Sequence, residues 1–273
     1  LDASSADAYD DVANQSVTAT VADDETAGFT LSTTSVSVTE AGGTDTFTVV
    51  LDAEPASDVV IWSASSDSGE AQVGGGAGIG LTFTSSNWAT PQTFTITGVD
   101  DSIDDGDQQA TFTVGVLNAS SDSAYDDVAN QSVTAMVADD DTAGFSVSKT
   151  TFSDDASVTE GGSTDMFTVV LNTEPTGDVV ISVLSSDTGE ATLSPSMLTF
   201  TAANWSTPQT VTITGVDDDI DDGDQSSTAT VVVNAGSTAD SVYDALGMTT
   251  AAPIGVTTTD DDTVGFTLST TSV

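Results

Sequence analysis

Two copies of a short acidic loop hold the residues of this chain that are best placed to do chemistry. The first copy, Val99 to Gln108, reads V-D-D-S-I-D-D-G-D-Q, and the second, Val216 to Gln225, reads V-D-D-D-I-D-D-G-D-Q. Five acids lie within the eight residues from Asp100 to Asp107. Two carboxylates about 5 Å apart repel each other by roughly 1–3 kcal/mol at the effective dielectric of a protein surface. Something of opposite charge must offset that repulsion.

The chain itself offers almost no positive charge for this purpose. It contains 44 acids and a single base, Lys149, with no His and no Cys, so its formal net charge is −43. Carboxylate oxygens are the preferred ligands of hard divalent cations, Ca²⁺ above all. The loops therefore predict Ca²⁺ sites. The same charge balance excludes direct binding of nucleic acid, which needs Lys and Arg, and the composition excludes thiolate and imidazole metal sites.

Other uses of the acidic residues fit the sequence less well. An EF-hand needs Gly at loop position 6 and Glu at position 12, but a count from Asp217 places Gly223 at 7 and Thr228 at 12. The glycines from Val73 to Leu81 lack the Asp of a calcium β-roll and the Lys-Ser/Thr of a phosphate loop. Among 44 acids, a pair with glycosidase spacing is expected by chance, so such a pair is no evidence for a hydrolase. We therefore expect no enzyme. The remaining alternative is a solvated, salt-adapted surface.

The elements that must position the loops recur along the chain. Residues 1–29 recur almost unchanged at 117–145, and an Ala-Gly-Phe or Val-Gly-Phe motif begins at residues 27, 143 and 264, which gives a period of about 116–121 residues. No spacer rich in Ser, Gly or Pro separates the repeats, so adjacent repeats are expected to sit at a fixed angle. The predicted organisation is the last strands of a preceding repeat at 1–26, full repeats at 27–142 and 143–263, and the first strand of a following repeat at 264–273.

Alternation of apolar and polar residues predicts about seven short strands in each repeat. In Thr210–Thr214, for example, Val211 and Ile213 face a core while the threonines face water. Phe167, Phe200 and Trp205 are predicted core aromatics. This pattern is typical of an all-β fold built from antiparallel, Ig-like β-sandwiches. In the second repeat the predicted strands are 144–150 with its continuation 156–160, then 164–171, 178–184, 197–201, 209–215, 227–234 and 254–259.

An ordered set of motifs, present in both full repeats, carries a resemblance to a known family. In the second repeat the set is V-T-E-G-G at 158–162, L-T-F at 198–200, the strand at 210–215, the acidic loop, and D-D-D-T at 260–263. This set resembles the Calx-β family, the calcium-binding sandwich of sodium–calcium exchangers that also recurs in large bacterial surface proteins. The resemblance implies that the early Glu, the acidic loop and the closing Asp run supply Ca²⁺ ligands at one end of each sandwich.

Carried over by motif, the resemblance implies a ligand set in each repeat. The implied ligands of the first repeat are Glu40, Asp100, Asp101, Asp105, Asp107, Asp139, Asp140 and Asp141, and those of the second are Glu160, Asp217, Asp218, Asp222, Asp224, Asp260, Asp261 and Asp262. The backbone carbonyl of Ile103 or Ile220 is a further candidate ligand, and Asp67 and Asp187 match a mid-domain aspartate of the family. The chain departs from the exchanger loop at Gln108 and Gln225, where that loop ends in Glu, and at Gly106 and Gly223, which replace acids.

These observations predict a structural role. We expect tandem Calx-β-like sandwiches, stabilised by Ca²⁺, that form an extracellular stalk, adhesin shaft or filament on a bacterial surface. The expected partners are neighbouring repeats of the same chain, and identical chains if the protein forms a filament. Alternatives are a self-assembling filament or surface-layer subunit, or a calcium-responsive regulatory module of a membrane protein. No apolar run of about 18 residues occurs, so membrane insertion is not expected.

Overall fold

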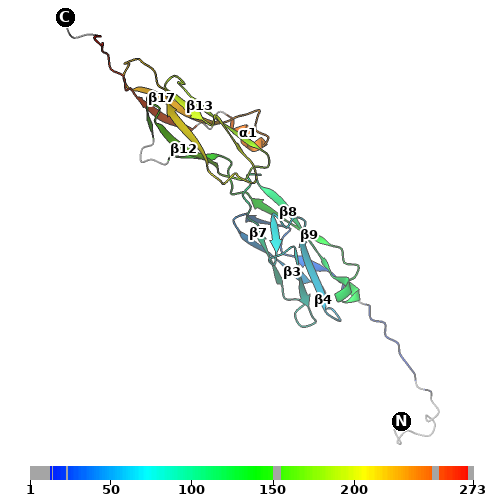
Figure 1. Cartoon of the computed structure of the whole chain (residues 1–273). Coiled ribbons are helices and arrows are strands. Elements are labelled where there is room, and N and C mark those ends of the chain that lie inside the picture. The colour runs from blue at the N-terminus through cyan, green and yellow to red at the C-terminus, as the bar shows by residue number, and fades with distance from the viewer. Residues whose placement is uncertain (1–12, 14, 23, 150–154, 248–251, 270–273) are drawn as a thin grey trace.

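The computed structural model describes residues 13, 15–22, 24–149, 155–247 and 252–269. Within them the chain forms two β-sandwiches of nine strands each, which lie end to end in Figure 1. The first contains β1 (Phe29–Leu31), β2 (Ser35–Thr39), β3 (Thr44–Leu51), β4 (Val59–Ser65), β5 (Ala71–Val73), β6 (Gly78–Phe83), β7 (Gln92–Gly98), β8 (Gln108–Val116) and β9 (Gln131–Ala138), with 3₁₀ turns at Asn118–Ser120 and Ser123–Tyr125. The second contains β10 (Phe145–Lys149), β11 (Ala156–Thr159), β12 (Thr164–Leu171), β13 (Val179–Ser185), β14 (Ala191–Ser194), β15 (Met197–Phe200), β16 (Gln209–Gly215), β17 (Gln225–Val233), helix α1 (Ser241–Leu246) and β18 (Ala252–Thr259).

Each sandwich packs a four-stranded sheet against a five-stranded sheet, with the same topology in both. The strand orders are β1-β3-β7-β5 and β2-β9-β8-β4-β6 in the first sandwich, and β10-β12-β16-β14 and β11-β18-β17-β13-β15 in the second. On β3 the inward positions Phe47, Val49 and Leu51 are buried, while the intervening residues are half-buried. Each sandwich has its own hydrophobic core, and the two cores share no residue. The predicted all-β sandwich fold is confirmed.

The sheets differ from the prediction in one respect that matters for the site. The sequence predicted that β11 would continue β10 in an antiparallel sandwich, but the two strands belong to different sheets, and β11 pairs in parallel with β18. The first sandwich repeats this arrangement, because β2 pairs in parallel with β9. Alternation of apolar residues reveals which side of a strand is buried but not which strand lies beside it. This split, together with the short strands β5 and β14, gives nine strands instead of about seven.

A glycine at the end of β7 brings the two sheets of the first sandwich close together. A Cβ atom on Gly98 would lie 2.1 Å from the carbonyl oxygen of Thr39, the last residue of β2. Gly215 approaches Thr159 in the same way in the second sandwich, with the same distance of 2.1 Å. Any larger residue would push the acidic loop, which begins one residue later, away from the end of β2 or β11.

The segments on either side of the two sandwiches form no strands among the residues described. Figure 1 shows them leaving from opposite ends of the molecule, before β1 and after β18. The predicted strands of flanking repeats fall partly on these residues and partly on 1–12 and 270–273, which lie outside the described residues. A strand needs a paired neighbour, and residues 15–22 and 264–269 have none in the described part of the chain.

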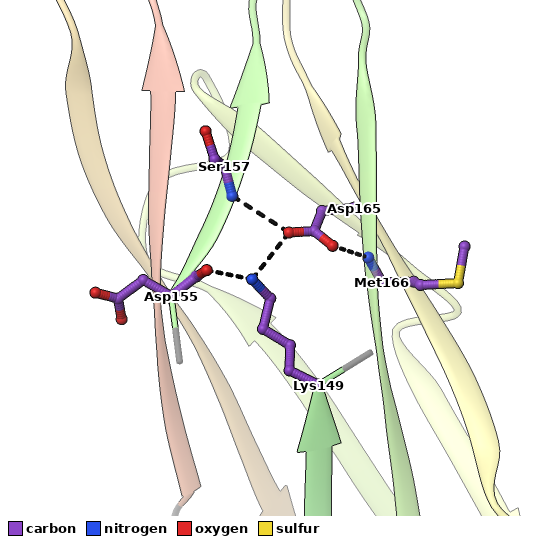
Figure 2. Close-up of polar contacts among 5 residues, drawn as sticks. All are labelled: Lys149, Asp155, Ser157, Asp165 and Met166. Atoms are coloured by element: carbon purple, nitrogen blue, oxygen red, sulfur yellow. Dashed lines mark hydrogen bonds and ion pairs between the residues drawn. The ribbon is translucent and has the colours of Figure 1, made fainter. Parts of the chain in front are cut away.

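The single basic side chain of the protein reaches from the end of β10 to Asp165 on β12. The Nζ of Lys149 is 2.9 Å from Oδ2 of Asp165 and also donates to the carbonyl oxygen of Asp155 (Figure 2). The same carboxylate accepts the backbone amides of Ser157 and Met166. Together these contacts hold the pKa of Asp165 below its usual value against the opposing effect of burial. Lys149 is thus already paired with one acid.

Candidate metal centres

The parallel strand pair brings the first two acids of the candidate site together. Thr39 at the end of β2 lies opposite Ala138 at the end of β9, so the next residues, Glu40 and Asp139, leave the sheet side by side. The amide of Glu40 donates to the carbonyl of Ala138 at 3.1 Å, which fixes this arrangement. One carboxylate oxygen from each of Glu40, Asp139 and Asp141 lies within 4.8 Å of the others. We call this end of each sandwich the acid end.

Backbone amides orient the acids at the acid end of the first sandwich. Asp139 accepts the amide of Gly106 at 2.7 Å and the amide of Asp141 at 2.8 Å, while its own amide donates to Asp107 at 3.2 Å. Gly106 has φ +75°, a left-handed conformation that favours glycine. Glycine at this position, where the exchanger loop has an acid, therefore shapes the loop around Asp139. Asp107 serves as an acceptor for the backbone of the closing Asp run.

Burial and mutual repulsion make the first acid end unfavourable for ionised carboxylates. Glu40 is 1% exposed, and its Oε2 atom has no hydrogen-bond partner among the described residues. Burial, followed by repulsion from Asp101 and Asp139, raises the pKa of Glu40 to about 7. Burial also raises the pKa of Asp141, with further contributions from Asp139 and Asp140. The charged groups that raise the pKa of Glu40 are all acids, so only an external cation can keep this cluster ionised at low energy.

Glu70 joins this cluster, although sequence reasoning assigned it no role. It lies immediately before β5, and its Oε2 is also buried without a hydrogen-bond partner among the described residues. Burial and the charge of Asp105 raise its pKa. The sequence holds a signal for Glu70, because S-S-D-x-G-E-A occurs at both 65–71 and 185–191. The family resemblance, however, pointed to the aspartate of that motif. Asp67 accepts the amide of Gly69 at 3.0 Å and so stabilises the turn that presents Glu70.

The second sandwich repeats the arrangement from its own residues. Glu160 follows β11, is 1% exposed, and has a buried Oε2 without a partner in the described chain. One carboxylate oxygen from each of Glu160, Asp260 and Asp262 lies within 4.8 Å of the others. Burial, with repulsion from Asp260, Asp218 and Asp222, raises the pKa of Glu160. Burial raises the pKa of Glu190 as well, and this residue corresponds to Glu70.

The remaining predicted ligands lie around these two clusters. The charges of Asp101 and Asp105 raise the pKa of Glu40, and the charge of Asp100 raises the pKa of Asp141. The charges of Asp217 and Asp261 raise the pKa of Asp262. Asp224 accepts the backbone amide of Asp260 at 3.3 Å. The carbonyl of Ile103 accepts the amide of Asp105 at 3.0 Å, and that of Ile220 accepts the amide of Asp222 at 2.9 Å, so each already has one partner within its own loop.

One acid of each loop points to the next segment of chain instead of the cluster. Asp104 accepts the amide of Ala143, the residue that leads into the second sandwich, at 2.7 Å. Asp221 accepts the amide of Val264 at the same distance of 2.7 Å. Sequence reasoning gave neither residue a role. Each acidic loop therefore links its cluster to the following segment.

The chemistry of the donors fits a hard divalent cation. Each acid end gathers oxygen donors only, at least two of them buried and without a hydrogen-bond partner in the described chain. Ca²⁺ takes about six to eight oxygens, from mono- or bidentate carboxylates and carbonyls. Such a donor set suits Ca²⁺ better than softer metals, which prefer nitrogen and sulfur.

None of the described helices is long and apolar enough to span a membrane.

No family model and no curated protein matches the chain. Among solved structures it is similar to the calcium-binding domain CBD12 of CALX1.1, with 14% identity over 85% of this chain and 99% of that one, at a TM-score of 0.34. It is also similar to the D00-D0 domain of Intimin (15% identity, 86% of this chain and 100% of that one, TM-score 0.29) and to the S-layer protein rSbsC (16% identity, 86% and 29%, TM-score 0.34). Because all these TM-scores are below 0.5, the assignments rest on the residues of this chain.

Proposed function

We propose that this protein is a structural, extracellular array of sandwiches that Ca²⁺ stabilises at each acid end, as part of a stalk, adhesin shaft or filament on a bacterial surface. The observation that carries the proposal is the pair of buried glutamates, Glu40 and Glu160. Each has an oxygen without a hydrogen-bond partner in the described chain, and the charged groups that act on it are all acids. In a chain with a single Lys and no Arg or His, the missing positive charge must come from solution.

The geometry suggests how ion binding would act mechanically. Bound Ca²⁺ would hold Glu40 and the Asp139–Asp141 run against the acidic loop. The same loop accepts the amide of Ala143 through Asp104 and accepts the amide of Glu174 at 2.7 Å through the carbonyl of Ser102. An ion at the acid end would therefore order the contact between the sandwiches. The result would be a stiffer rod in Ca²⁺ than without it.

The proposed location follows from the ion concentration that such sites need. Ca²⁺ modules that work outside cells bind with affinities of about 10⁻⁴–10⁻³ M, far weaker than intracellular sensors. Raised carboxyl pKa values favour weak binding, because the ion must displace protons from the cluster before it binds. Millimolar Ca²⁺ outside cells would keep such sites filled.

A thermal melt of the full chain tests the proposal. We expect the melting temperature to rise by about 5–10 °C in about 10 mM Ca²⁺ relative to EDTA, since binding to the native state alone contributes RT ln(1 + [L]/Kd), or about 1.4–2.7 kcal/mol per site when the ion is 10- to 100-fold above its Kd. A third sample in EDTA with about 1 M NaCl separates ion binding from screening, because monovalent salt at that concentration shortens the Debye length to about 3 Å. Equal rescue by NaCl would reduce the acids to a salt-adapted surface and overturn the proposal.

A further inference from the structure

The sequence contains two Asp-Gly pairs, and both lie at the acid ends. Asp105-Gly106 belongs to the first acidic loop and Asp222-Gly223 to the second. The glycines are among the positions at which these loops depart from the exchanger loop, which has acids there. Since glycine has no side chain, nothing on the second residue of such a pair shields its backbone nitrogen from the carboxyl group of the preceding aspartate. The two groups can therefore react with each other.

Hydrogen bonds polarise the peptide group that joins Asp105 to Gly106. Its carbonyl oxygen accepts Nε2 of Gln108 at 3.2 Å, and its amide donates to Oδ2 of Asp139 at 2.7 Å. The first contact draws electrons away from the peptide nitrogen, and an ionised glutamate at position 108 could not donate it. The second contact places a carboxylate where it can accept the amide proton. Together they favour loss of that proton, which makes the nitrogen a nucleophile.

The second acidic loop repeats this arrangement with its own residues. The carbonyl oxygen of Asp222 accepts Nε2 of Gln225 at 3.2 Å, and the amide of Gly223 donates to Oδ2 of Asp260 at 2.6 Å. Gly223 has φ +78°, close to the +75° of Gly106. The polarised peptide is thus a property of the loop itself and does not depend on which sandwich carries it.

The carboxyl group of each Asp-Gly pair lies close to the cluster of acids. The charge of Asp105 raises the pKa of both Glu40 and Glu70, and Asp222 has the same effect on the equivalent glutamates of the second sandwich. An ion bound among these acids would hold the carboxylate there, away from the backbone nitrogen. Both Asp105 and Asp222 are exposed, so without an ion each has room to turn away from the acids that repel it.

We infer that Asp105-Gly106 and Asp222-Gly223 are sites of a spontaneous covalent modification that bound Ca²⁺ suppresses. The glycine nitrogen attacks Cγ of the preceding aspartate, and a C–N bond forms. The amide proton and the hydroxyl of the neutral carboxyl group leave together as water, which closes a succinimide ring. A water molecule then adds to the ring and breaks the bond between the nitrogen and the original backbone carbonyl carbon. The product is isoaspartate, whose backbone runs through the former side chain.

The modification makes the loss of an ion permanent. Isoaspartate adds one carbon atom to the backbone and moves the carboxylate that lay beside the cluster, so the altered loop no longer presents the same ligands. In the first sandwich the same loop contacts the second sandwich through the carbonyl of Ser102 and the carboxylate of Asp104. An acid end that has been without Ca²⁺ would therefore stay loosened after the ion returns. The suppression by Ca²⁺ rests on the proposed function.

Prolonged incubation of the full chain in Ca²⁺ and in EDTA, below its melting temperature, tests this inference. Mass spectrometry of chymotryptic peptides, with electron-transfer fragmentation to distinguish isoaspartate from aspartate, measures the reaction at each loop. We expect isoaspartate to accumulate at both loops in EDTA, faster than in a free peptide of residues 99–108, because only the folded loop polarises the peptide group. When Ca²⁺ is 10- to 100-fold above its Kd, about 1–10% of the sites are empty, so the rate should fall about 10- to 100-fold.

Variants of the first loop test the role of the polarised peptide, and the second loop of the same molecule is the internal reference. Gln108→Met removes the donor to the Asp105 carbonyl and should slow the reaction there about 2- to 10-fold in EDTA, the worth of one hydrogen bond. Gln109→Met makes the same chemical change at the next, exposed position and should react like the wild type. Gly106→Asn should block the reaction at Asp105, because asparagine tolerates the left-handed conformation and its Cβ would meet nothing within 4 Å.

The possible outcomes separate the inference from the proposed function. Equal rates in Ca²⁺ and in EDTA, together with a melting temperature that rises in Ca²⁺, overturn the inference and leave the calcium proposal standing. A melting temperature that Ca²⁺ does not change overturns the calcium proposal and, with it, the suppression of the reaction. A rate in EDTA no faster than that of the free peptide, or a wild-type rate in Gln108→Met, also contradicts the inference.

Discussion

The two acid ends of this molecule share one constellation of acids but differ in their surroundings. At the first, the second sandwich covers the loop, Ile103 is half-buried, and Asp104 accepts the amide of the buried Ala143. At the second, Ile220 is 59% exposed and Asp221 accepts the amide of Val264, which is 82% exposed. The comparison separates two tasks within one loop. Some acids of each loop face the cluster, and one accepts a backbone amide from the segment that follows.

The difference also predicts which acid end influences the stiffness of the molecule. An ion bound at the first acid end would order a loop that contacts both sandwiches. An ion at the second would order a loop that, among the described residues, holds the segment after β18 and no second sandwich. Variants placed at equivalent positions in the two sandwiches can therefore separate ion binding from coupling between sandwiches.

The largest effect is expected when the buried glutamates are neutralised. Glu40→Gln and Glu160→Gln should each abolish the calcium-dependent stabilisation of its own sandwich, about 1.4–2.7 kcal/mol when Ca²⁺ is 10- to 100-fold above its Kd. In EDTA the same variants should be as stable as the wild type or more so, because each removes a buried, repelled carboxylate. Thermal melts in Ca²⁺ and in EDTA measure both effects.

Glu54→Gln, at an exposed position, is the control for this pair because it makes the same chemical change away from both acid ends. It should melt like the wild type in both buffers. If Glu40→Gln destabilised the chain equally in Ca²⁺ and in EDTA, Glu40 would be a structural residue and not an ion ligand.

A smaller effect should distinguish Glu70 from its neighbour Asp67. Because the Oε2 of Glu70 is buried in the cluster, Glu70→Gln should weaken Ca²⁺ binding about 10- to 100-fold. Asp67→Asn should change affinity only slightly, since Asp67 caps a turn through the amide of Gly69. Calcium titrations of the two variants make the comparison. A stronger effect at Asp67 would make Asp67, and not Glu70, the ion ligand.

The raised pKa of Glu40 predicts opposite pH trends with and without the ion. Glu40 has an ordinary pKa of 4.5 and a folded pKa of about 7, so between these values the folded state binds more protons than the unfolded state. Stability in EDTA should therefore fall as pH rises through this window. The stabilisation by Ca²⁺ should instead shrink as pH falls below about 7, because protons compete for the same carboxylate. Melting temperatures that stay flat in EDTA between pH 5 and pH 8 would contradict the assigned cause.

Asp104 and Asp221, which point away from their clusters, should differ in their contribution to stability. Asp104→Ala removes the acceptor for the buried amide of Ala143, where the two sandwiches meet, and should lower stability by about 1–2 kcal/mol. It should also increase the flexibility between the sandwiches. Asp221→Ala should cost less than about 0.5 kcal/mol, because Val264 is exposed. Melts and small-angle X-ray scattering of both variants report these effects. Equal behaviour of the two would remove the distinction between the covered and the open acid end.

A small effect is also expected at the single lysine. In the first sandwich Asp45 accepts the amides of Ser37 and Thr46, the same pattern that Asp165 shows with Ser157 and Met166. Since Asp45 has no ion pair of this kind among the described residues, Lys149→Met should cost about 1 kcal/mol or less, by the same amount in Ca²⁺ and in EDTA. A calcium-dependent change would place Lys149 in the electrostatics of the second acid end.

The sequence predicted the sandwich fold but not which strands lie side by side, and two nearly identical segments show how far a strand depends on its neighbours. Gln131–Ala138 forms β9, which lies between β2 and β8, and its Val133 is fully buried in the core. Gln15–Ala22 differs from it at one position, yet forms no strand, and Val17 is 95% exposed. Local alternation is the same in both. The neighbours that turn such a pattern into a strand are a tertiary property.

The same limit applied to the candidate site. The early glutamate and the closing Asp run stood out because acids recur there in both repeats, and the structure brings Glu40 together with Asp139 and Asp141. Their contact depends on the parallel pairing of β2 with β9, which alternation cannot reveal. The place of Glu70 in the cluster depends on how the turn before β5 packs, which the S-S-D-x-G-E-A motif alone does not show. The direction in which Asp104 points depends on the loop backbone and on the sandwich beyond it.

Calorimetric titration of Ca²⁺ into the full chain at about pH 7.5 tests the central claim most directly, in the wild type and in the double variant Glu40→Gln/Glu160→Gln. The account predicts saturable binding at about 10⁻³ M or tighter in the wild type. It predicts loss of that binding in the double variant, which should remain folded in EDTA. Absence of binding to the wild type, or unchanged binding to the double variant, would contradict the account.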